Sequence, residues 1–131
     1  MPRNDALNWP DPVEVLAPAD RTTTATSAAI DLQPYAGNVA VLLHVALGTG
    51  TTPTLDAKVQ HCDSSGGSYA DITGAAFTQV TGAAGAGVQK LMLNTRSIYR
   101  YIKLVATIAG TSPHFLSSAG LLAEPEWPTA V

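Results

Sequence analysis

The chain has 131 residues, of which 46% are hydrophobic, 13% charged and 6% aromatic, and its net charge is −3. One domain of this length buries a sufficient core without a disulfide or a structural metal. Seven basic residues against ten acidic ones argue against a nucleic-acid-binding protein, which needs a basic face to neutralise phosphates. No apolar run approaches the roughly 20 residues that span a bilayer, and Cys62, the single cysteine, excludes an internal disulfide.

The two ends of the chain differ from its body. Residues 1–20 contain Trp9 and four prolines, and they lack the basic and apolar segments of a signal peptide. Proline removes a backbone donor and fixes φ, so this stretch is predicted to be an extended arm with an edge strand at residues 13–16. Residues 124–131, with Trp127 between prolines, are predicted to be a short tail. Both ends are acidic.

The body, residues 21–123, reads as β-structure from alternating apolar positions and frequent turn residues. Residues 39–47 place valine and leucine on one face, and the other face also carries an apolar residue, Leu42. A strand that is apolar on both faces is predicted to be central. The remaining predicted strands are residues 26–32, 55–61, 72–80, 88–94, 99–109 and 115–123.

Turn signals separate these strands at short intervals, the pattern of a sandwich or a small barrel. Glycine, proline and serine gather at residues 48–53, 63–68, 81–87 and 110–113. We therefore expect an all-β fold, an antiparallel two-layer β-sandwich of jelly-roll-like or Ig-like type. The sandwich is predicted to span residues 21–123, between the arm and the tail.

Candidate chemistry is sparse. His61 and Cys62 are adjacent, so in a strand they point to opposite faces and do not share a metal ion without distortion. The glycine-rich loops lack the residues of a phosphate-binding loop, and no nucleophile elbow or HExxH motif is present. The sequence predicts a protein that is not an enzyme and takes no cofactor and no metal ion.

The apolar second face of the predicted sandwich is the strongest indication that the protein contacts another protein surface. A sandwich sheet hides one face, and its other face is expected to be polar, yet Leu42, Val88, Met92 and Val105 fall on the second face of their strands. The arm of the same chain, the arm of a neighbour, or a subunit interface could cover it. We expect a homo-oligomer. The candidate contact residues are Trp9, Val13, Val15, Leu42, Tyr99, Tyr101 and Trp127.

Sugar binding is an alternative that the composition leaves open. β-Sandwiches that bind carbohydrate stack exposed aromatic rings on sugar faces, and the candidates here are Tyr35, Tyr69, Tyr99 and Tyr101. The same rings could instead cover a sheet edge or contact another protein chain.

Several runs of sequence resemble the small virion structural proteins of tailed bacteriophages, in particular capsid decoration (cement) proteins. The resemblance spans residues 55–122 and rests on strand and turn patterns. These are the runs at residues 55–61, 63–66, 69–72 and 77–81, the RYIK strand at residues 100–103 and the AGTSPHF turn at residues 109–115. Tyr69 stands where tryptophan is typical of the family, and Cys62 stands where serine is usual.

The resemblance implies a β-sandwich trimer on the outside of the capsid that bridges neighbouring coat subunits. It implies the major capsid protein as a partner, with no direct contact to nucleic acid or membrane, and synthesis in the host cytoplasm. A head-fibre base, a neck protein or a tail-associated protein of the same family is the alternative virion role. The arm with Trp9 and the tail with Trp127 are the predicted docking elements.

Overall fold

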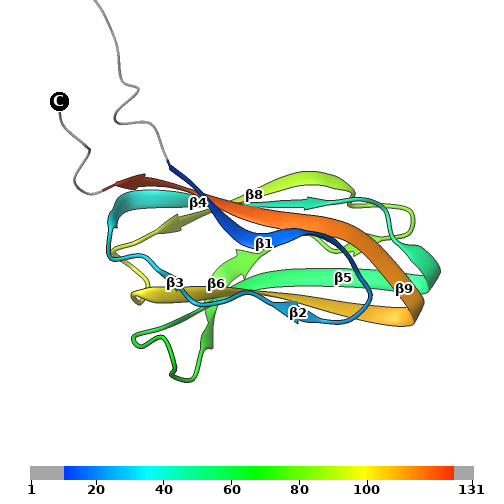
Figure 1. The fold of residues 1–131 in the computed structure, drawn as a ribbon, viewed down its shortest axis with the longest axis horizontal. Helices are drawn as coiled ribbons and strands as arrows, with labels where there is room; N and C mark the ends of the chain where they lie inside the picture. The colour runs from blue at the N-terminus through cyan, green and yellow to red at the C-terminus, as the bar shows by residue number, and fades with distance from the viewer. Residues whose placement is uncertain (1–10, 126–131) are drawn as a thin grey trace, which may run out of the picture.

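The chain folds into two antiparallel β-layers packed face to face (Figure 1). The structure is a computed structural model and describes residues 11–125, so Trp9 and Trp127 lie outside the described residues. The described part is all-β, which confirms the predicted β-sandwich. No helix within residues 11–125 is long and apolar enough to cross a membrane.

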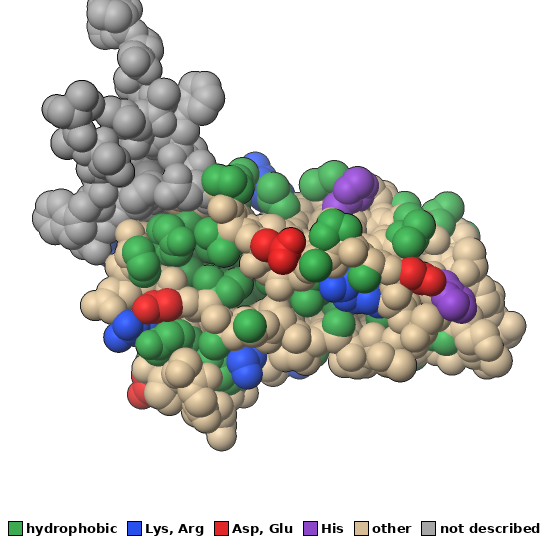
Figure 2. Space-filling model, in the orientation of Figure 1, with side chains coloured by type: hydrophobic (Ala, Val, Ile, Leu, Met, Phe, Trp, Pro, Cys, Tyr) green, Lys and Arg blue, Asp and Glu red, His purple; other side chains and the backbone are tan. Residues whose placement is uncertain are grey.

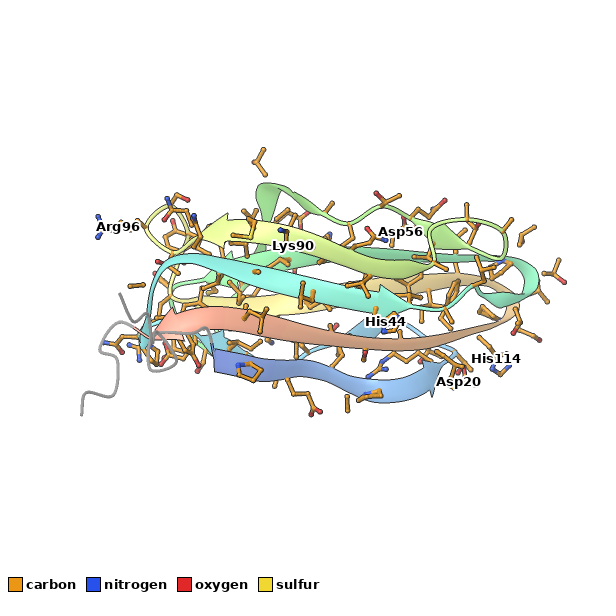
Figure 3. The ribbon with its side chains drawn as sticks, turned by 90° about the horizontal axis from the view of Figure 1, so that it is seen from above. Asp20, His44, Asp56, Lys90, Arg96 and His114 are labelled. Carbon is orange, nitrogen blue, oxygen red and sulfur yellow. The ribbon has the colours of Figure 1, made fainter. Side chains whose placement is uncertain are left out.

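Sheet A, the upper layer in Figure 1, contains four strands in the order β1-β9-β4-β8. Their bounds are β1 (Asp11–Arg21), β9 (Tyr101–Pro125), β4 (Tyr35–Val45) and β8 (Gly87–Asn94). Only the C-terminal part of β9 belongs to this layer. Figure 3 looks down on sheet A and shows the four strands side by side. The predicted central strand, β4, pairs on both edges, with β8 and β9.

Sheet B, the lower layer, is built around the N-terminal part of β9 and the long strand β5 (Thr49–Cys62). Two short strands, β2 (Ala25–Thr26) and β3 (Ile30–Asp31), pair with one edge of β9. On the other side, β6 (Ala70–Ala76) and β7 (Val80–Thr81) pair with β5.

One strand, β9, belongs to both layers, and the turn predicted at residues 110–113 is the bend at which this strand passes from one layer to the other. Residues 101–125 form a continuous strand that pairs first with β5 and then with β4. Gly110 and Ser112 have positive φ, of 121° and 50°, and they lie in the bend at which the strand passes from sheet B to sheet A and reverses its direction (Figure 1). The two predicted strands at residues 99–109 and 115–123 are therefore halves of one.

The core lies between the layers and is formed by alternate residues of the strands. Val39, Val41, Leu43 and Val45 of β4 are buried, as the alternation predicts. The predicted inward set of β5, Leu55, Ala57 and Val59, is buried as well, and so are Ile102, Leu104 and Ala106 of β9. Leu47 was expected on the inward face of β4 but is exposed, because the strand ends at Val45.

The predicted arm is a strand from residue 11 onwards. Residues 11–21 form β1 at the edge of sheet A, where they pair with β9. An edge strand tolerates proline because only one side of it must supply backbone hydrogen bonds. The register shifts between Leu16 and Ala19, so Pro18 falls in a bulge. The edge strand predicted at residues 13–16 is thus longer than expected.

Two other predicted strands are interrupted. The range 26–32 contains only the short strands β2 and β3, and Ser27 between them is buried. Its hydroxyl accepts a hydrogen bond of 2.9 Å from the backbone N–H of Leu104, so a polar residue occupies an inward position that alternation assigned to its neighbours. The range 72–80 is divided between β6 and β7.

Candidate functional site

The outer face of sheet A is apolar over most of its area. Its exposed large side chains are Val88 and Met92 of β8, 65% and 52% exposed, and Leu116 of β9, 63% exposed. Between them lie the half-buried Leu42 and Leu122. Figure 2 shows apolar side chains along the upper margin of the molecule, over sheet A. This face matches the apolar second face that the sequence predicts.

The outer face of sheet B is polar by contrast. Lys58 Nζ of β5 lies 2.9 Å from Asp71 Oδ1 of β6, and Gln60 Nε2 donates to the same carboxylate at 2.7 Å. The hydrogen bonds from Gln60 and Lys58 hold the pKa of Asp71 below its ordinary value. Gln79 donates to Asp56 at 3.0 Å. The two outer faces therefore differ, and only that of sheet A is suited to burial against another surface.

Val105 is an exception on sheet B. It lies on the outer face of that sheet, where it is half-buried among polar neighbours such as Lys103 and Thr107. A single apolar residue on a polar face is ordinary for a soluble protein. The predicted contribution of Val105 to an apolar second face is therefore confined to one position, whereas Leu42, Val88 and Met92 form a contiguous set.

Two hollows flank Leu116 at one end of the outer face of sheet A. One, of about 380 Å³, is lined by residues of β1, β4 and β9 that include Pro18, His44, Ala46 and Leu116 itself. The other, of about 410 Å³, is lined by residues that include Asp20 and His114, whose side chains lie 2.9 Å apart. Figure 3 shows His44 on the face and the Asp20–His114 pair at its end.

The opposite end of the sandwich carries an aromatic cluster. Tyr99 is 56% exposed, and its ring centroid lies 4.6 Å from that of His61. Hollows of about 340 and 360 Å³ flank it. Beside it, Arg100 forms two hydrogen bonds to Asp31, of 2.8 and 2.9 Å, and these bonds lower the pKa of the Asp31 carboxyl. The cluster offers an open ring with polar groups around it.

The predicted contact residues fall in three different environments. Val13 and Val15 are half-buried and pack against the core of their own chain, because β1 is part of the sandwich. Leu42 lies on the outer face of sheet A and Tyr101 on that of sheet B. Tyr99 lies in the aromatic cluster, just before β9 begins. The structure thus brings Leu42 together with Val88 and Met92 on the outer face of sheet A. Tyr99 and Tyr101 lie elsewhere on the molecule.

Sequence reasoning missed the contribution of β9 to the apolar face. Leu116 and Leu122 point outward because Phe115, Ala119, Leu121 and Ala123 point into the core. The sequence of residues 115–123 could have indicated this, because leucine occurs there at both odd and even positions and therefore on both faces of the strand. The register needed to place it beside Leu42 comes only from the pairing of β4 with β9.

Cys62 and its neighbour His61, which were considered as a metal ligand pair, make contacts within the fold. Within residues 11–125 no three side chains of His, Cys, Asp or Glu gather as metal ligands do. Cys62 is buried, with Asp63 Oδ1 at 3.8 Å and Ser64 Oγ at 3.9 Å from its sulfur. His61 accepts a hydrogen bond of 3.1 Å from the backbone N–H of Tyr99. These contacts hold the turns at this end of the sandwich.

Comparison with solved structures gives several distant likenesses, among them the following three. The SPBc2 prophage-derived protein YomS matches with a TM-score of 0.49 at 9% identity, covering 88% of this chain and 95% of that protein. The CBM22-1–GH10 modules of a Clostridium thermocellum xylanase, complexed with xylohexaose, match with a TM-score of 0.45 at 9% identity, covering 95% of this chain and 30% of that one. A human norovirus GI.7 virus-like particle matches with a TM-score of 0.38 at 9% identity, covering 100% of this chain and 35% of that one.

No protein-family model and no curated protein matches the sequence. The solved chains that it resembles include a prophage-derived protein and a viral capsid protein assembly. At these identities the likeness concerns the β-sandwich architecture, so the function is argued from the chain's own residues.

Proposed function

We propose that the protein is a non-enzymatic virion structural protein, a head decoration (cement) protein that binds the outside of the assembled capsid and bridges coat subunits. The observation that carries the proposal is the apolar outer face of sheet A, which exposes Val88, Met92 and Leu116. A protein that presents such a face is adapted to bind another protein surface. The resemblance of residues 55–122 to phage virion proteins supports a capsid as the assembly in which this occurs.

Decoration would stabilise the capsid by linkage. A protein that binds the assembled lattice, and does not bind free coat subunits, adds its binding free energy to the stability of the assembled state. Contacts repeated on many copies across the lattice multiply the effect. This role needs surfaces that bind and no catalytic group.

The docking elements in this proposal are the terminal segments. Trp9 and Trp127 lie in acidic, proline-rich sequence, and a tryptophan that enters a pocket is a typical interface anchor. The segments leave the sandwich at β1 and at the end of β9, which are neighbours in sheet A. The copies form a homo-oligomer, for which the resemblance implies a trimer.

Deletion of residues 2–10 tests the docking role. The deletion leaves β1 intact, so the sandwich should keep its circular dichroism spectrum and its unfolding midpoint. We expect it to abolish co-sedimentation with expanded capsids of the phage that encodes the protein, when those capsids lack it. The substitution Trp9→Ala should reproduce most of the loss. Normal co-sedimentation of the truncated protein would contradict the proposal.

The aromatic cluster supports a second candidate, a carbohydrate- or receptor-binding module. An exposed ring such as Tyr99, with hollows on both sides, is the arrangement on which a sugar face stacks. A glycan array decides: binding that Tyr99→Ala removes and Tyr69→Ala retains would favour this candidate, and an array without signal would leave capsid decoration.

A further inference from the structure

We propose that the outer face of sheet A pairs with the same face of a second copy, about a two-fold axis that runs parallel to the strands between β4 and β9. The pairing concerns the assembly of this chain with itself and does not depend on the virion role. It assigns this face to a second copy, leaves docking on a capsid to the terminal segments, and replaces the trimer that the resemblance implies with a dimer. It rests on the order of side chains across the sheet, which is complementary to its own rotated image.

The register of the four strands fixes this order. Residues that face each other across antiparallel strands lie side by side on one face, so outward residues form rows across β1, β9, β4 and β8. Four rows result: Pro12–Leu122–Ala40–Met92, Glu14–Gly120–Leu42–Lys90, then Ser118–His44–Val88, and Asp20–Leu116–Ala46.

At the centre of each row, a large residue on one strand lies opposite a small residue on the other. On β9 the outward residues are Leu116, Ser118, Gly120 and Leu122, and opposite them on β4 are Ala46, His44, Leu42 and Ala40. Every pair therefore joins a large side chain to a small one. The large member lies on β9 in the first and last rows and on β4 in the two middle rows, and no row places two large residues at the centre.

A two-fold axis between β4 and β9 places the large residues of one copy over the small residues of the other, so the two faces are complementary in shape. The rotation exchanges the two strands within each row and keeps the row, so a residue of β4 comes to lie over its own β9 neighbour in the second copy. Leu42 then lies over Gly120 of the second copy, and Leu122 lies over Ala40 of the second copy. Large residues enter the spaces above small ones throughout the centre, as close packing requires.

The charges at the edges are complementary under the same rotation. Glu14 and Lys90 occupy the two ends of one row, both are exposed, and neither forms an ion pair within residues 11–125. The rotation places Glu14 of each copy over Lys90 of the other, which gives two ion pairs. A two-fold axis across the strands would instead place Glu14 over Glu14 and Leu42 over Leu42.

The hollow beside Leu116 fits the same arrangement. Its lining includes Ala46 and Ser118, which Leu116 and His44 of the second copy would cover. Four strands about 4.8 Å apart and four rows about 6.8 Å apart give a face of about 500 Å² per copy. The total of about 1,000 Å² is at the lower limit of specific interfaces, so we expect a dimer that dissociates at micromolar concentrations.

Charge reversal tests the axis. In full-length protein, Glu14→Lys and Lys90→Glu should each weaken the dimer about tenfold or more, because like charges then face each other at both edges. The double variant Glu14→Lys/Lys90→Glu should restore it. Within one copy the two residues are three strands, about 14 Å, apart, beyond the screening length of about 8–10 Å, so the rescue reports contact between copies. Sedimentation velocity over a concentration series measures it.

Two further variants keep the test independent of folding. Gly120→Ala fills the space beneath Leu42, yet in one copy its Cβ meets only the Val13 carbonyl at an ordinary 3.5 Å, so it should weaken the dimer and leave the unfolding midpoint unchanged. Arg96→Glu, in the β8–β9 turn away from the face (Figure 3), matches the charge change of Lys90→Glu and should leave the dimer intact. A monomer at all concentrations, a trimer, or a double variant as weak as the singles would overturn the proposal.

Discussion

Phe115 shows how one side chain determines its surroundings. It is fully buried where β9 enters sheet A, and a Cβ atom built at Gly48 would lie 2.5 Å from its Cε1 atom. Sequence alone identifies Gly48 as a loop residue, because the run around it is rich in glycine and threonine. The structure shows that the absence of a side chain there makes room for the ring.

Gly48→Ala should therefore destabilise the fold. We expect a loss of about 1–3 kcal/mol in the free energy of unfolding, since a fully buried ring has no space into which to move. The cost should fall in the presence of Phe115→Leu, which removes the ring atoms that the new methyl group meets. Urea unfolding of the two single variants and the double variant measures the coupling. Equal costs of Gly48→Ala in both backgrounds would contradict the account.

The Asp31–Arg100 pair gives a prediction on pH. The hydrogen bonds from Arg100 lower the pKa of Asp31 in the folded state. The pair therefore contributes stability above the unfolded carboxyl pKa of about 3.9, and that contribution disappears as pH falls through the lower folded value. Because the pair is exposed and screened by solvent, its contribution should be small.

Asp31→Asn tests this sign. The variant should be less stable than the parent protein at pH 7, and the difference should shrink towards zero at the acid end of a urea-unfolding series. Asp63→Asn, whose carboxyl forms no ion pair in the described part of the chain, is the matched control. A difference for Asp31→Asn that is the same at every pH would contradict the assignment.

At the scale of elements, β9 organises the fold. It pairs with β5, β2 and β3 in sheet B and with β1 and β4 in sheet A. The bend between its halves lies at Gly110, whose φ is 121°. A Cβ atom there would lie 2.8 Å from the carbonyl oxygen of Thr52 and 2.9 Å from Cα of Pro53, so both the conformation and the space require glycine.

Gly110→Ala should accordingly cost about 1–3 kcal/mol of unfolding free energy. The contact is with backbone atoms, which do not move aside as a side-chain end does. Gly66→Ala is the control, because a Cβ atom at Gly66 meets nothing within 4 Å and its φ is not positive. We expect the control to lie within about 0.5 kcal/mol of the parent protein. Thermal unfolding of both variants gives the comparison, and equal stabilities would refute the role of Gly110.

The strands that the sequence predicts well are those with a clean alternation. Residues 55–61 alternate strictly between apolar and polar residues, and they lie within β5. At residues 110–113 the chain turns as Gly-Thr-Ser-Pro predicts, but only the pairing partners show that the residues before and after the turn are two halves of one strand in different layers. The edge strand predicted at residues 13–16 is found within β1, which is longer than predicted because an edge strand accepts the prolines that flank this range.

The candidate site was predictable in part for the same reason. Alternation identifies Leu42, Val88 and Met92 as outward apolar residues. The sequence does not reveal that β4 lies between β8 and β9, and so it does not show that Leu116 and Leu122 join them on one face. Register between distant strands is a long-range property, and short-range periodicity does not specify it.

For the whole molecule, the two outer faces differ in character. Sheet B presents Asp56, Lys58 and Gln60 to solvent in hydrogen-bonded groups, whereas sheet A presents leucine, valine and methionine. A monomer in solution has no use for an outer face that is apolar. An assembled protein uses it, because one face is buried against protein and the other remains in water.

We infer that the outer face of sheet A is covered by protein in the working assembly. Cryo-electron microscopy of intact phage particles tests it most directly. We expect density for this β-sandwich on the capsid exterior, with Leu42, Met92 and Leu116 buried against a protein surface and sheet B facing solvent. Particles without the sandwich, or a sandwich whose sheet A faces open solvent, would contradict the account.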